Sequence, residues 1–231
     1  MLEIKGIESG YGQSMIIHDF NLTAKQGEVI ALMGRNGAGK TTLLKTIIGL
    51  IKVKNGTISY QGEDITSKNP EDRALSGIAY VPQGRDIFPF LTVHENLILG
   101  LEARGKNASD IPPDIYELFP ELKTISNRKG GDLSGGQQQQ LAIARMLITN
   151  PSMVLLDEPT EGIQPNIVSS IEHSIRLIKE QGKVTVLLVE QFIEFAIRLA
   201  DTCYVMEKGS IVFGEKTADI SKEMICEHLS L

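Results

Sequence analysis

The chain has 231 residues, of which 42% are hydrophobic and 23% are charged, and this composition is typical of a folded globular protein. Its 29 acidic residues outnumber the 23 basic ones and give a formal net charge of −6, which argues against a broad basic surface for nucleic acid. No apolar run approaches the roughly 18 residues of a membrane-spanning helix, and the first residues lack the layout of a secretory signal. We therefore expect a cytosolic chain without a nucleic-acid partner.

The first part of the chain reads as strands joined by turns, with one helix. Residues 2–7 predict a strand, and the apolar residues 29–33 predict a strand that is buried on both faces. A glycine-rich loop follows, and residues 42–50 then show a helical pattern. Asn55 and Gly56 stand between two short apolar segments and predict a hairpin turn. Residues 78–81 predict another buried strand, which ends at Pro82.

Residues 90–150 differ in character and read as a mostly helical insert. Thr92 and Glu95 have the spacing of a capping box and predict the start of a helix over residues 95–104. Two consecutive prolines, Pro112 and Pro113, predict the start of a second helix that continues to residue 119. A third helix is predicted over residues 134–147.

Strands return after residue 151. Residues 153–156 and 184–189 are apolar runs of the kind that form buried strands, and residues 167–179 between them predict a helix. Residues 202–206 and 210–213 predict a closing hairpin. Because strands alternate with helices, we expect a mainly parallel sheet that is covered by helices.

The loop after residues 29–33 has the pattern G-x-x-x-x-G-K-[ST] of a phosphate-binding loop. Its glycines let several backbone N–H groups point at one phosphate group, and the following helix adds the positive end of its dipole. Lys40 would reach the β- and γ-phosphates, and Thr41 would ligate Mg²⁺. The alternative is a simple glycine turn with an exposed lysine. The pattern consists of Gly34, Arg35, Asn36, Gly37, Ala38, Gly39, Lys40 and Thr41.

Two acids follow the apolar run at 153–156. A buried strand that ends in Asp157 and Glu158 places carboxylates at the carboxyl edge of a parallel sheet, where ligands bind. Asp157 would hold Mg²⁺, and Glu158 would act as the general base for an attacking water. Strands often end in acidic residues that have no such role. The assignment of Asp157 and Glu158 therefore depends on the phosphate loop in the same chain.

A third motif, Leu133-Ser134-Gly135-Gly136-Gln137, opens the last helix of the insert. Ser134 and Gln137 can cap the start of this helix, and capping alone is the simpler interpretation. Capping does not require two consecutive glycines, however. Gly135 and Gly136 leave backbone N–H groups bare at a positive helix end, which suits an anion. The motif therefore predicts a second nucleotide-binding element.

Together these three motifs resemble the ATP-binding subunit of an ABC transporter, over nearly the whole chain from Met1 to about Gly214. The resemblance implies an ATPase with an α/β fold of the P-loop NTPase (RecA-like) type. Such a fold has a mainly parallel core sheet, an N-terminal antiparallel β subdomain and a helical insert. It also implies a nucleotide-binding core over residues 1–88 and 150–215, a helical signature subdomain over about 89–149, and a C-terminal tail over 216–231.

The resemblance assigns further roles. Tyr11 would stack on adenine, although an aromatic residue at the end of a strand can also be plain core. Gln83 would contact Mg²⁺ and the attacking water, so that Thr41, Gln83 and Asp157 together serve the metal. The implied ATP-binding residues are Tyr11, Gly34, Arg35, Asn36, Gly37, Ala38, Gly39, Lys40, Thr41 and Thr42. In a head-to-tail dimer, Leu133, Ser134, Gly135, Gly136 and Gln137 would face the ATP that the partner chain holds, with Ser134 and Gly136 contacting its γ-phosphate.

Two positions depart from the usual pattern of this family. Gln191 stands where a histidine usually contacts the γ-phosphate, so the implied catalytic set is Glu158, Gln83 and Gln191. A glutamine donates a hydrogen bond but carries no charge and cannot shuttle a proton. Gln164 stands in a segment that often ends in aspartate, so we expect contacts across the dimer to differ.

These two departures indicate a subgroup of the family. Gln191 is similar to the branched-chain amino acid importer group, and residues 82–89, 133–141 and 161–165 look more like its urea-importer branch. We therefore predict an ATPase that energises urea import. The alternatives are an importer of branched-chain or other amino acids, a soluble ABC ATPase without a transport role, and, against the signature motif, a small kinase. Residues 138–140 form a glutamine run and predict a solvated helix face.

An importer role implies partners. We expect integral membrane permease subunits, a second related ATPase subunit in a head-to-tail dimer and, indirectly, an extracytoplasmic solute-binding protein. The chain would then lie on the cytoplasmic side of the inner membrane as a peripheral protein. Phe88, Phe90 and Leu91 would help to form the docking surface for the permease, the alternative being ordinary insert core.

Overall fold

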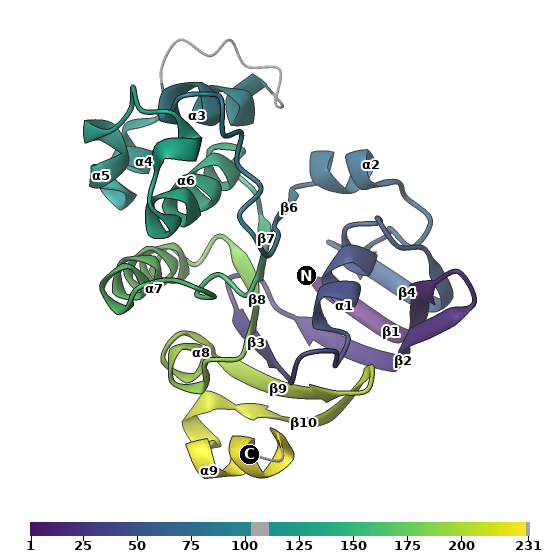
Figure 1. Ribbon diagram of the computed structural model, residues 1–231. Helices are drawn as coiled ribbons and strands as arrows, with labels where there is room; N and C mark the ends of the chain where they lie inside the picture. The colour runs from purple at the N-terminus through teal and green to yellow at the C-terminus, as the bar shows by residue number, and fades with distance from the viewer. Residues whose placement is uncertain (103–110, 230–231) are drawn as a thin grey trace.

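The computed structural model describes residues 1–102 and 111–229, and Figure 1 shows its three parts. A four-stranded antiparallel sheet in the order β2-β1-β4-β5 lies on one side of a six-stranded sheet in the order β10-β9-β3-β8-β7-β6. A lobe of four helices, α3–α6, projects from the far end. The strands of the smaller sheet are β1 (Leu2–Tyr11), β2 (Ser14–Ala24), β4 (Val53–Tyr60) and β5 (Glu63–Asp64).

The larger sheet explains the apolar runs of the sequence. Its strands β3, β7 and β8 pair in parallel, and their side chains are buried on both faces, as such runs predict. The registers Met33↔Glu190 and Asp157↔Val189 bring the carboxyl ends of these strands to one edge. The six strands are β3 (Val29–Met33), β6 (Ile78–Val81), β7 (Met153–Asp157), β8 (Thr185–Glu190), β9 (Thr202–Glu207) and β10 (Ser210–Lys216).

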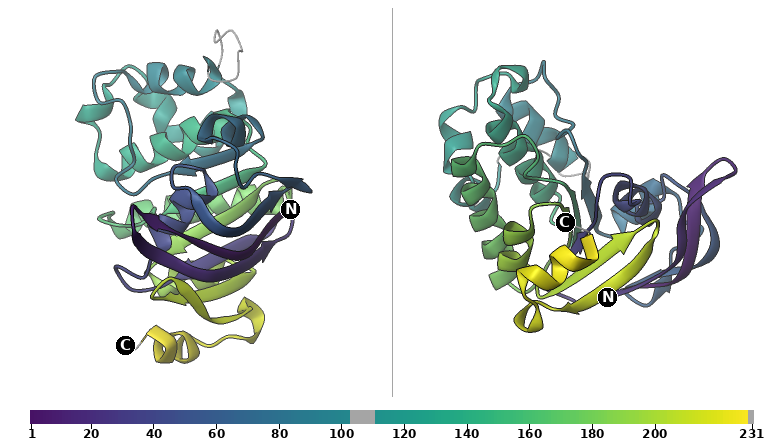
Figure 2. Two further views of the ribbon diagram at one scale, coloured as in Figure 1. Left: turned by 90° about the vertical axis from the view of Figure 1, so that its right-hand side faces the viewer. Right: turned by 60° about the horizontal axis from the view of Figure 1, so that its bottom comes forward.

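Two apolar cores cover the faces of the larger sheet. Ile30 and Leu32 face a core shared with α1 and the antiparallel sheet, whereas Val29 and Ala31 face a core shared with α6, α7 and α8. Figure 2 shows this layering from two further directions. The helices are α1 (Lys40–Ile47), α2 (Pro70–Leu75), α3 (Val93–Glu102), α4 (Pro113–Leu118), α5 (Pro120–Thr124), α6 (Gly135–Ile148), α7 (Pro165–Glu180), α8 (Ile193–Leu199) and α9 (Lys222–Leu229).

The predicted hairpin at Asn55-Gly56 is wrong, because these residues lie inside the continuous strand β4. Gly56 has φ +83°, and a Cβ there would lie 2.3 Å from the carbonyl oxygen of Gly6 on β1. The register between β1 and β4 shifts at this point, so the Asn-Gly pair forms a bulge. The turn comes instead at Gln61-Gly62, where both residues have positive φ and connect β4 to β5.

The helical lobe confirms the predicted capping box. The Thr92 N–H donates to Glu95 Oε2 at 2.7 Å, and the Glu95 N–H donates to Thr92 Oγ1 at 3.1 Å. The predicted helix over 95–104 begins at Val93 and continues to Glu102, and Arg104 lies outside the described residues. The next predicted helix, from Pro113 to residue 119, is confirmed as α4, and the short helix α5 that follows from Pro120 was not predicted.

The glutamine run is not a solvated face. Gln139 and Gln140 are buried, and Gln138 is half-buried. The amide of Gln140 donates to Ser170 Oγ on α7 at 2.9 Å. This side of α6 packs against α7, and the local sequence does not show where α7 lies. The glutamines are therefore buried although their polar composition predicts exposure to solvent.

The C-terminal residues extend the fold beyond the last strand. Ile225 and Leu229 of α9 are buried against the core on the α8 side, and Phe213 stacks on His228 with ring centroids 4.6 Å apart. Over residues 1–102 and 111–229, no helix combines the length and the apolar character that crossing a membrane requires.

Candidate active site

The phosphate-loop motif joins the carboxyl end of β3 to the first turn of α1. Gly37 has φ +82° and Gly39 has φ +107°, conformations that favour glycine. Gly34 is required for a different reason, because a Cβ there would lie 2.6 Å from the carbonyl oxygen of Met206. No side chain caps the start of α1 at Gly39, so its first N–H groups remain available to a ligand anion.

Lys40 does not extend into solvent, and the interpretation as an exposed lysine is therefore wrong. Its side chain is 4% exposed. Its Nζ donates to the carbonyl oxygens of Gly34 at 2.7 Å and Arg35 at 3.1 Å, and lies 3.2 Å from Glu158 Oε1. The ammonium group thus sits at the centre of the loop and is paired with the carboxylate that follows β7.

Asp157 ends β7 beside the loop, and each of its two carboxylate oxygens accepts a hydrogen bond. Thr41 Oγ1 donates to Oδ1 at 3.1 Å, and the Tyr80 hydroxyl donates to Oδ2 at 3.0 Å. Burial raises the pKa of the Asp157 carboxyl, and the bonds from Thr41 and Tyr80 act in the opposite direction. Burial, with the nearby charge of Asp157, raises the pKa of Tyr80, so the hydroxyl remains a donor.

Glu158 and Gln191 tie together the ends of three elements. The backbone of Glu158 has φ +48°, and its N–H donates to the carbonyl oxygen of Val189 at 2.9 Å. The amide Nε2 of Gln191 donates to Glu158 Oε2 at 2.9 Å and to Asn36 Oδ1 at 2.7 Å. The loop after β3, the end of β7 and the end of β8 are therefore linked through side chains.

The remaining predicted residues lie around this centre. Gln83 is exposed and donates from Nε2 to Glu161 Oε2 at 2.7 Å. Tyr11 is 53% exposed, which rules out the alternative of plain core. Thr42 is buried in α1, and Gln164 is exposed at the start of α7.

The residues of the signature motif begin α6. Ser134 caps this helix, with the Gln137 N–H donating to Ser134 Oγ at 3.3 Å and the Ser134 N–H to Gln137 Oε1 at 3.0 Å. A Cβ on Gly136 would lie 2.4 Å from Cγ2 of Ile167, so this glycine also serves the packing of α6 on α7. Within the described part of the chain, the hydrogen bonds of residues 133–137 do not reach residues 34–42.

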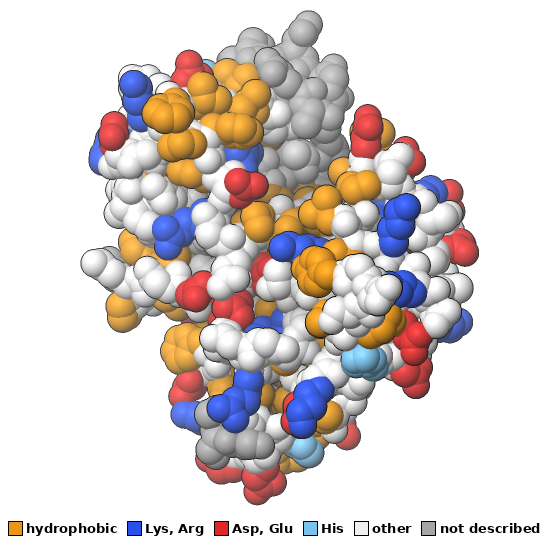
Figure 3. Space-filling model, turned by 45° about the vertical axis from the view of Figure 1, so that its right-hand side comes forward, with side chains coloured by type: hydrophobic (Ala, Val, Ile, Leu, Met, Phe, Trp, Pro, Cys, Tyr) orange, Lys and Arg blue, Asp and Glu red, His pale blue; other side chains and the backbone are white. Residues whose placement is uncertain are grey.

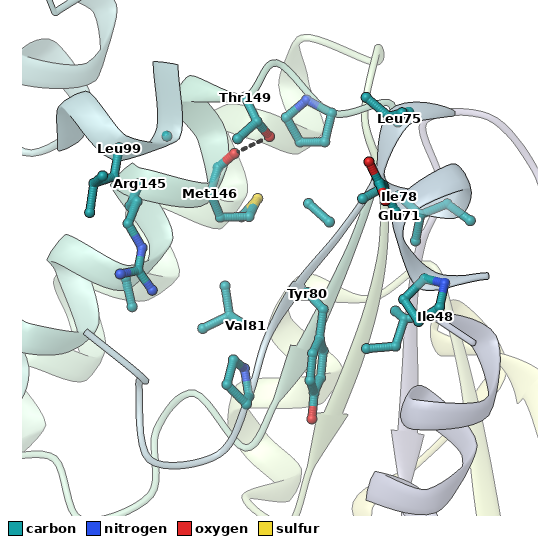
Figure 4. Close-up of a pocket in the computed structure, with 18 of the residues that line it drawn as sticks. Ile48, Glu71, Leu75, Ile78, Tyr80, Val81, Leu99, Arg145, Met146 and Thr149 are labelled. Carbon is teal, nitrogen blue, oxygen red and sulfur yellow. Dashed lines mark hydrogen bonds between the residues drawn. The ribbon is translucent and has the colours of Figure 1, made fainter. Parts of the chain in front are cut away.

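Sequence reasoning missed two features of this region. The first is the Tyr80 hydroxyl on Asp157, which could have been suspected only from a tyrosine near the end of a strand. The second is a groove of about 1190 Å³ between α2, β6, α3 and α6 (Figure 4). In it, the guanidinium of Arg145 lies 5.0 Å from the centroid of the Phe88 ring, and its Nη1 has no partner within the described structure.

A glycine loop with a buried lysine, a threonine paired with an aspartate, and a glutamate at the next residue define a P-loop nucleotide hydrolase. The fold and the position of the site at the sheet edge agree with this class. Residues 17–161 match the ABC transporter family. The chain belongs to this family, and it is an ATPase.

Relatives and solved structures match almost the whole chain. It is 41% identical to the high-affinity branched-chain amino acid transport ATP-binding protein BraG of Pseudomonas aeruginosa, covering 94% of each chain. It is 37% identical to the probable branched-chain amino acid transport ATP-binding protein LivF of Archaeoglobus fulgidus, covering 92% of this chain and 91% of the relative. A dimeric post-hydrolysis structure of the ATP-binding cassette MJ0796 with ADP and Pi superposes with a TM-score of 0.84 at 27% identity, covering 94% of this chain and 99% of that one.

Proposed function

We propose that this chain hydrolyses ATP to energise an importer of branched-chain amino acids. The single observation that carries the ATPase role is the cluster of Lys40, Thr41, Asp157 and Glu158 at one sheet edge. Two relatives that match over more than nine-tenths of the chain are named for branched-chain amino acid transport, and they favour this substrate class over urea. The short segments that resembled the urea branch weigh less than that overall similarity.

Binding of ATP would begin at the phosphate loop. In the structure the Lys40 ammonium is satisfied by two carbonyl oxygens and by Glu158. The β- and γ-phosphates would take over these contacts, with the N–H groups of residues 37–41 as further donors. Tyr11 is exposed at the end of β1 and is available to stack on the adenine ring.

The donors around Asp157 suit Mg²⁺. This ion prefers oxygen ligands and retains several waters and substrate phosphates in its shell. Thr41 Oγ1 and Asp157 Oδ1 lie 3.1 Å apart, and Gln83 can add an amide oxygen from the loop after β6. No group of three or more His, Cys, Asp or Glu side chains suits a metal in the described ranges. Bound Mg²⁺ would neutralise charge on the phosphates.

Glu158 would act as the general base. Its carboxylate is held by Gln191 on one oxygen and by Lys40 on the other. When Lys40 turns to the phosphates, one oxygen becomes free to accept a proton from water. Gln191 keeps the carboxylate in place as a neutral donor, so its own protonation does not enter the pH dependence of hydrolysis.

The capped start of α6 would complete a second chain's site. Ser134→Arg should preserve ATP affinity but abolish hydrolysis, because the bulky side chain obstructs the partner's nucleotide. Mixing it with Lys40→Ala should restore activity if the chain pairs with itself, since each mixed dimer contains one intact site. No restoration from two folded variants would indicate pairing with a different ATPase subunit. Unchanged activity in Ser134→Arg would refute the split site.

The groove would receive a helical segment of the permease. It is lined mainly by apolar residues, and Leu75 at its edge is 71% exposed. Hydrophobic side chains gather around this hollow and on the lobe above it (Figure 3). Of the predicted trio, Phe88 lines the groove, Phe90 is 86% exposed and Leu91 is half-buried.

Co-extraction tests this docking. Detergent extraction of wild-type chain should recover integral membrane subunits, and Leu75→Glu should lose them. Val212→Glu, an exposed apolar residue on β10 outside the groove, is the matched control and should retain them. Equal recovery with Leu75→Glu would contradict docking in the groove.

The chain would act within a larger membrane assembly. The permease would hold it peripherally at the cytoplasmic face of the membrane, and an extracytoplasmic solute-binding protein would deliver the substrate. Within the chain, residues 1–88 and 150–215 would form the nucleotide-binding core, residues 89–149 the signature subdomain and residues 216–231 a tail.

A further inference from the structure

Tyr80 reaches the site from a strand that carries none of the family's motifs. Strand β6 pairs in parallel with β7, and Tyr80 lies opposite Leu155. Side chains two residues apart share a face of a strand, so Tyr80, Leu155 and Asp157 point to the same side. The tyrosine ring packs against the core shared with α1, and its hydroxyl meets Asp157 Oδ2 at 3.0 Å. In Figure 4 the hydroxyl points away from Met146 and Thr149 across the groove.

The two donors on Asp157 bond different oxygens of its carboxylate. Thr41 lies in the first turn of α1 and has one hydroxyl, which bonds Asp157 Oδ1. A metal ion at that hydroxyl would use a lone pair of its oxygen and leave its hydrogen free to bond Asp157 Oδ1. Tyr80 is anchored by its ring and approaches the other oxygen. Its bond is therefore compatible with a metal on the Thr41 side.

We propose that Tyr80 is a positioning residue for the metal site, which holds the Asp157 carboxylate through Oδ2 and leaves Oδ1 directed at the metal. This rests on the proposed role of Asp157 toward Mg²⁺. Without the hydroxyl, a buried carboxylate oxygen loses its donor, and the carboxylate is held only from the Thr41 side. Loss of a hydrogen bond to a charged group then weakens the metal-dependent part of nucleotide binding.

Nucleotide affinity with and without the metal tests this role. In Tyr80→Phe, the affinity for ATP with Mg²⁺ should fall about tenfold, while the affinity for ATP with EDTA stays at the wild-type value. Tyr60→Phe is the matched control, because its hydroxyl also bonds a side chain, Ser152 Oγ at 2.7 Å, but away from this site. It should leave both affinities unchanged.

Three results would overturn the proposal. Unchanged affinity with Mg²⁺ in Tyr80→Phe shows that the hydroxyl does not position Asp157. Equal losses with Mg²⁺ and with EDTA show that Tyr80 supports the fold of the nucleotide site rather than the metal. Asp157→Asn separates the role of Tyr80 from that of Asp157. If Mg²⁺ raises the ATP affinity of that variant as much as it does in wild type, the role of Asp157 itself is overturned.

Discussion

Glu158→Gln should separate the binding of ATP from its hydrolysis. In the structure, Glu158 Oε1 lies 3.2 Å from Lys40 Nζ, and the two side chains are 7% and 4% exposed. Wild-type protein must give up this pair when Lys40 turns to the phosphates. A hydrogen bond between charged groups is worth about 1.5–3 kcal/mol. A neutral amide loses much of that interaction, so the affinity for ATP should rise by about tenfold.

Hydrolysis should respond in the opposite direction. Removal of a general base costs about 10²–10⁴-fold in rate, and the variant should accumulate as an ATP-bound closed dimer. The assay combines calorimetric titration of ATP, initial rates of phosphate release and gel filtration with ATP. Glu180→Gln, an exposed glutamate at the end of α7, controls for the loss of one charge. Turnover near the wild-type rate, or weaker ATP binding, would refute this reasoning.

Three further substitutions test one packing contact, one buried carboxyl group and one hydrogen bond. Gly136→Ala forces α6 away from α7 and should cost about 1–3 kcal/mol of unfolding free energy in urea, more than Gly135→Ala, whose Cβ meets only a flexible arginine. Burial raises the pKa of Glu190 above its ordinary value of 4.5. The stability advantage of wild type over Glu190→Gln, measured as the difference in unfolding free energy, should therefore fall as the pH rises above about 4.5. A difference that rises instead would contradict this. Glu161→Ala removes the acceptor of the Gln83 amide and should raise the Mg²⁺ concentration for half-maximal ATPase, whereas Glu161→Gln, which can still accept, should not.

Local sequence was sufficient for features that depend on near neighbours. Strands β3 and β7 follow from the apolar runs at 29–33 and 153–156, and the Thr92–Glu95 capping box involves residues of a single helical turn. The residues of the phosphate loop could be named because glycine positions and the lysine are fixed by spacing. The spacing does not predict that Lys40 pairs with Glu158 across the sheet edge.

Errors arose where a distant segment decided the outcome. Gly56 belongs to a bulge because its backbone lies close to Gly6 on the neighbouring strand. The Asn-Gly pattern is local and does not predict that contact. Gln140 is buried because α7 brings Ser170 to its amide. Tyr80 meets Asp157, 77 residues away, only because β6 and β7 pair in parallel. Each contact is tertiary, and one sequence alone does not specify it.

Uptake of labelled leucine tests the central claim most directly. Cells that lack this chain should lose leucine uptake and retain uptake of labelled urea. Wild-type chain and Lys183→Ala, which changes an exposed loop lysine, should restore it, and Lys40→Ala should not. Loss of urea uptake alone would keep the ATPase but contradict the substrate. Restoration of leucine uptake by Lys40→Ala would contradict the claim that ATP binding at this site drives import.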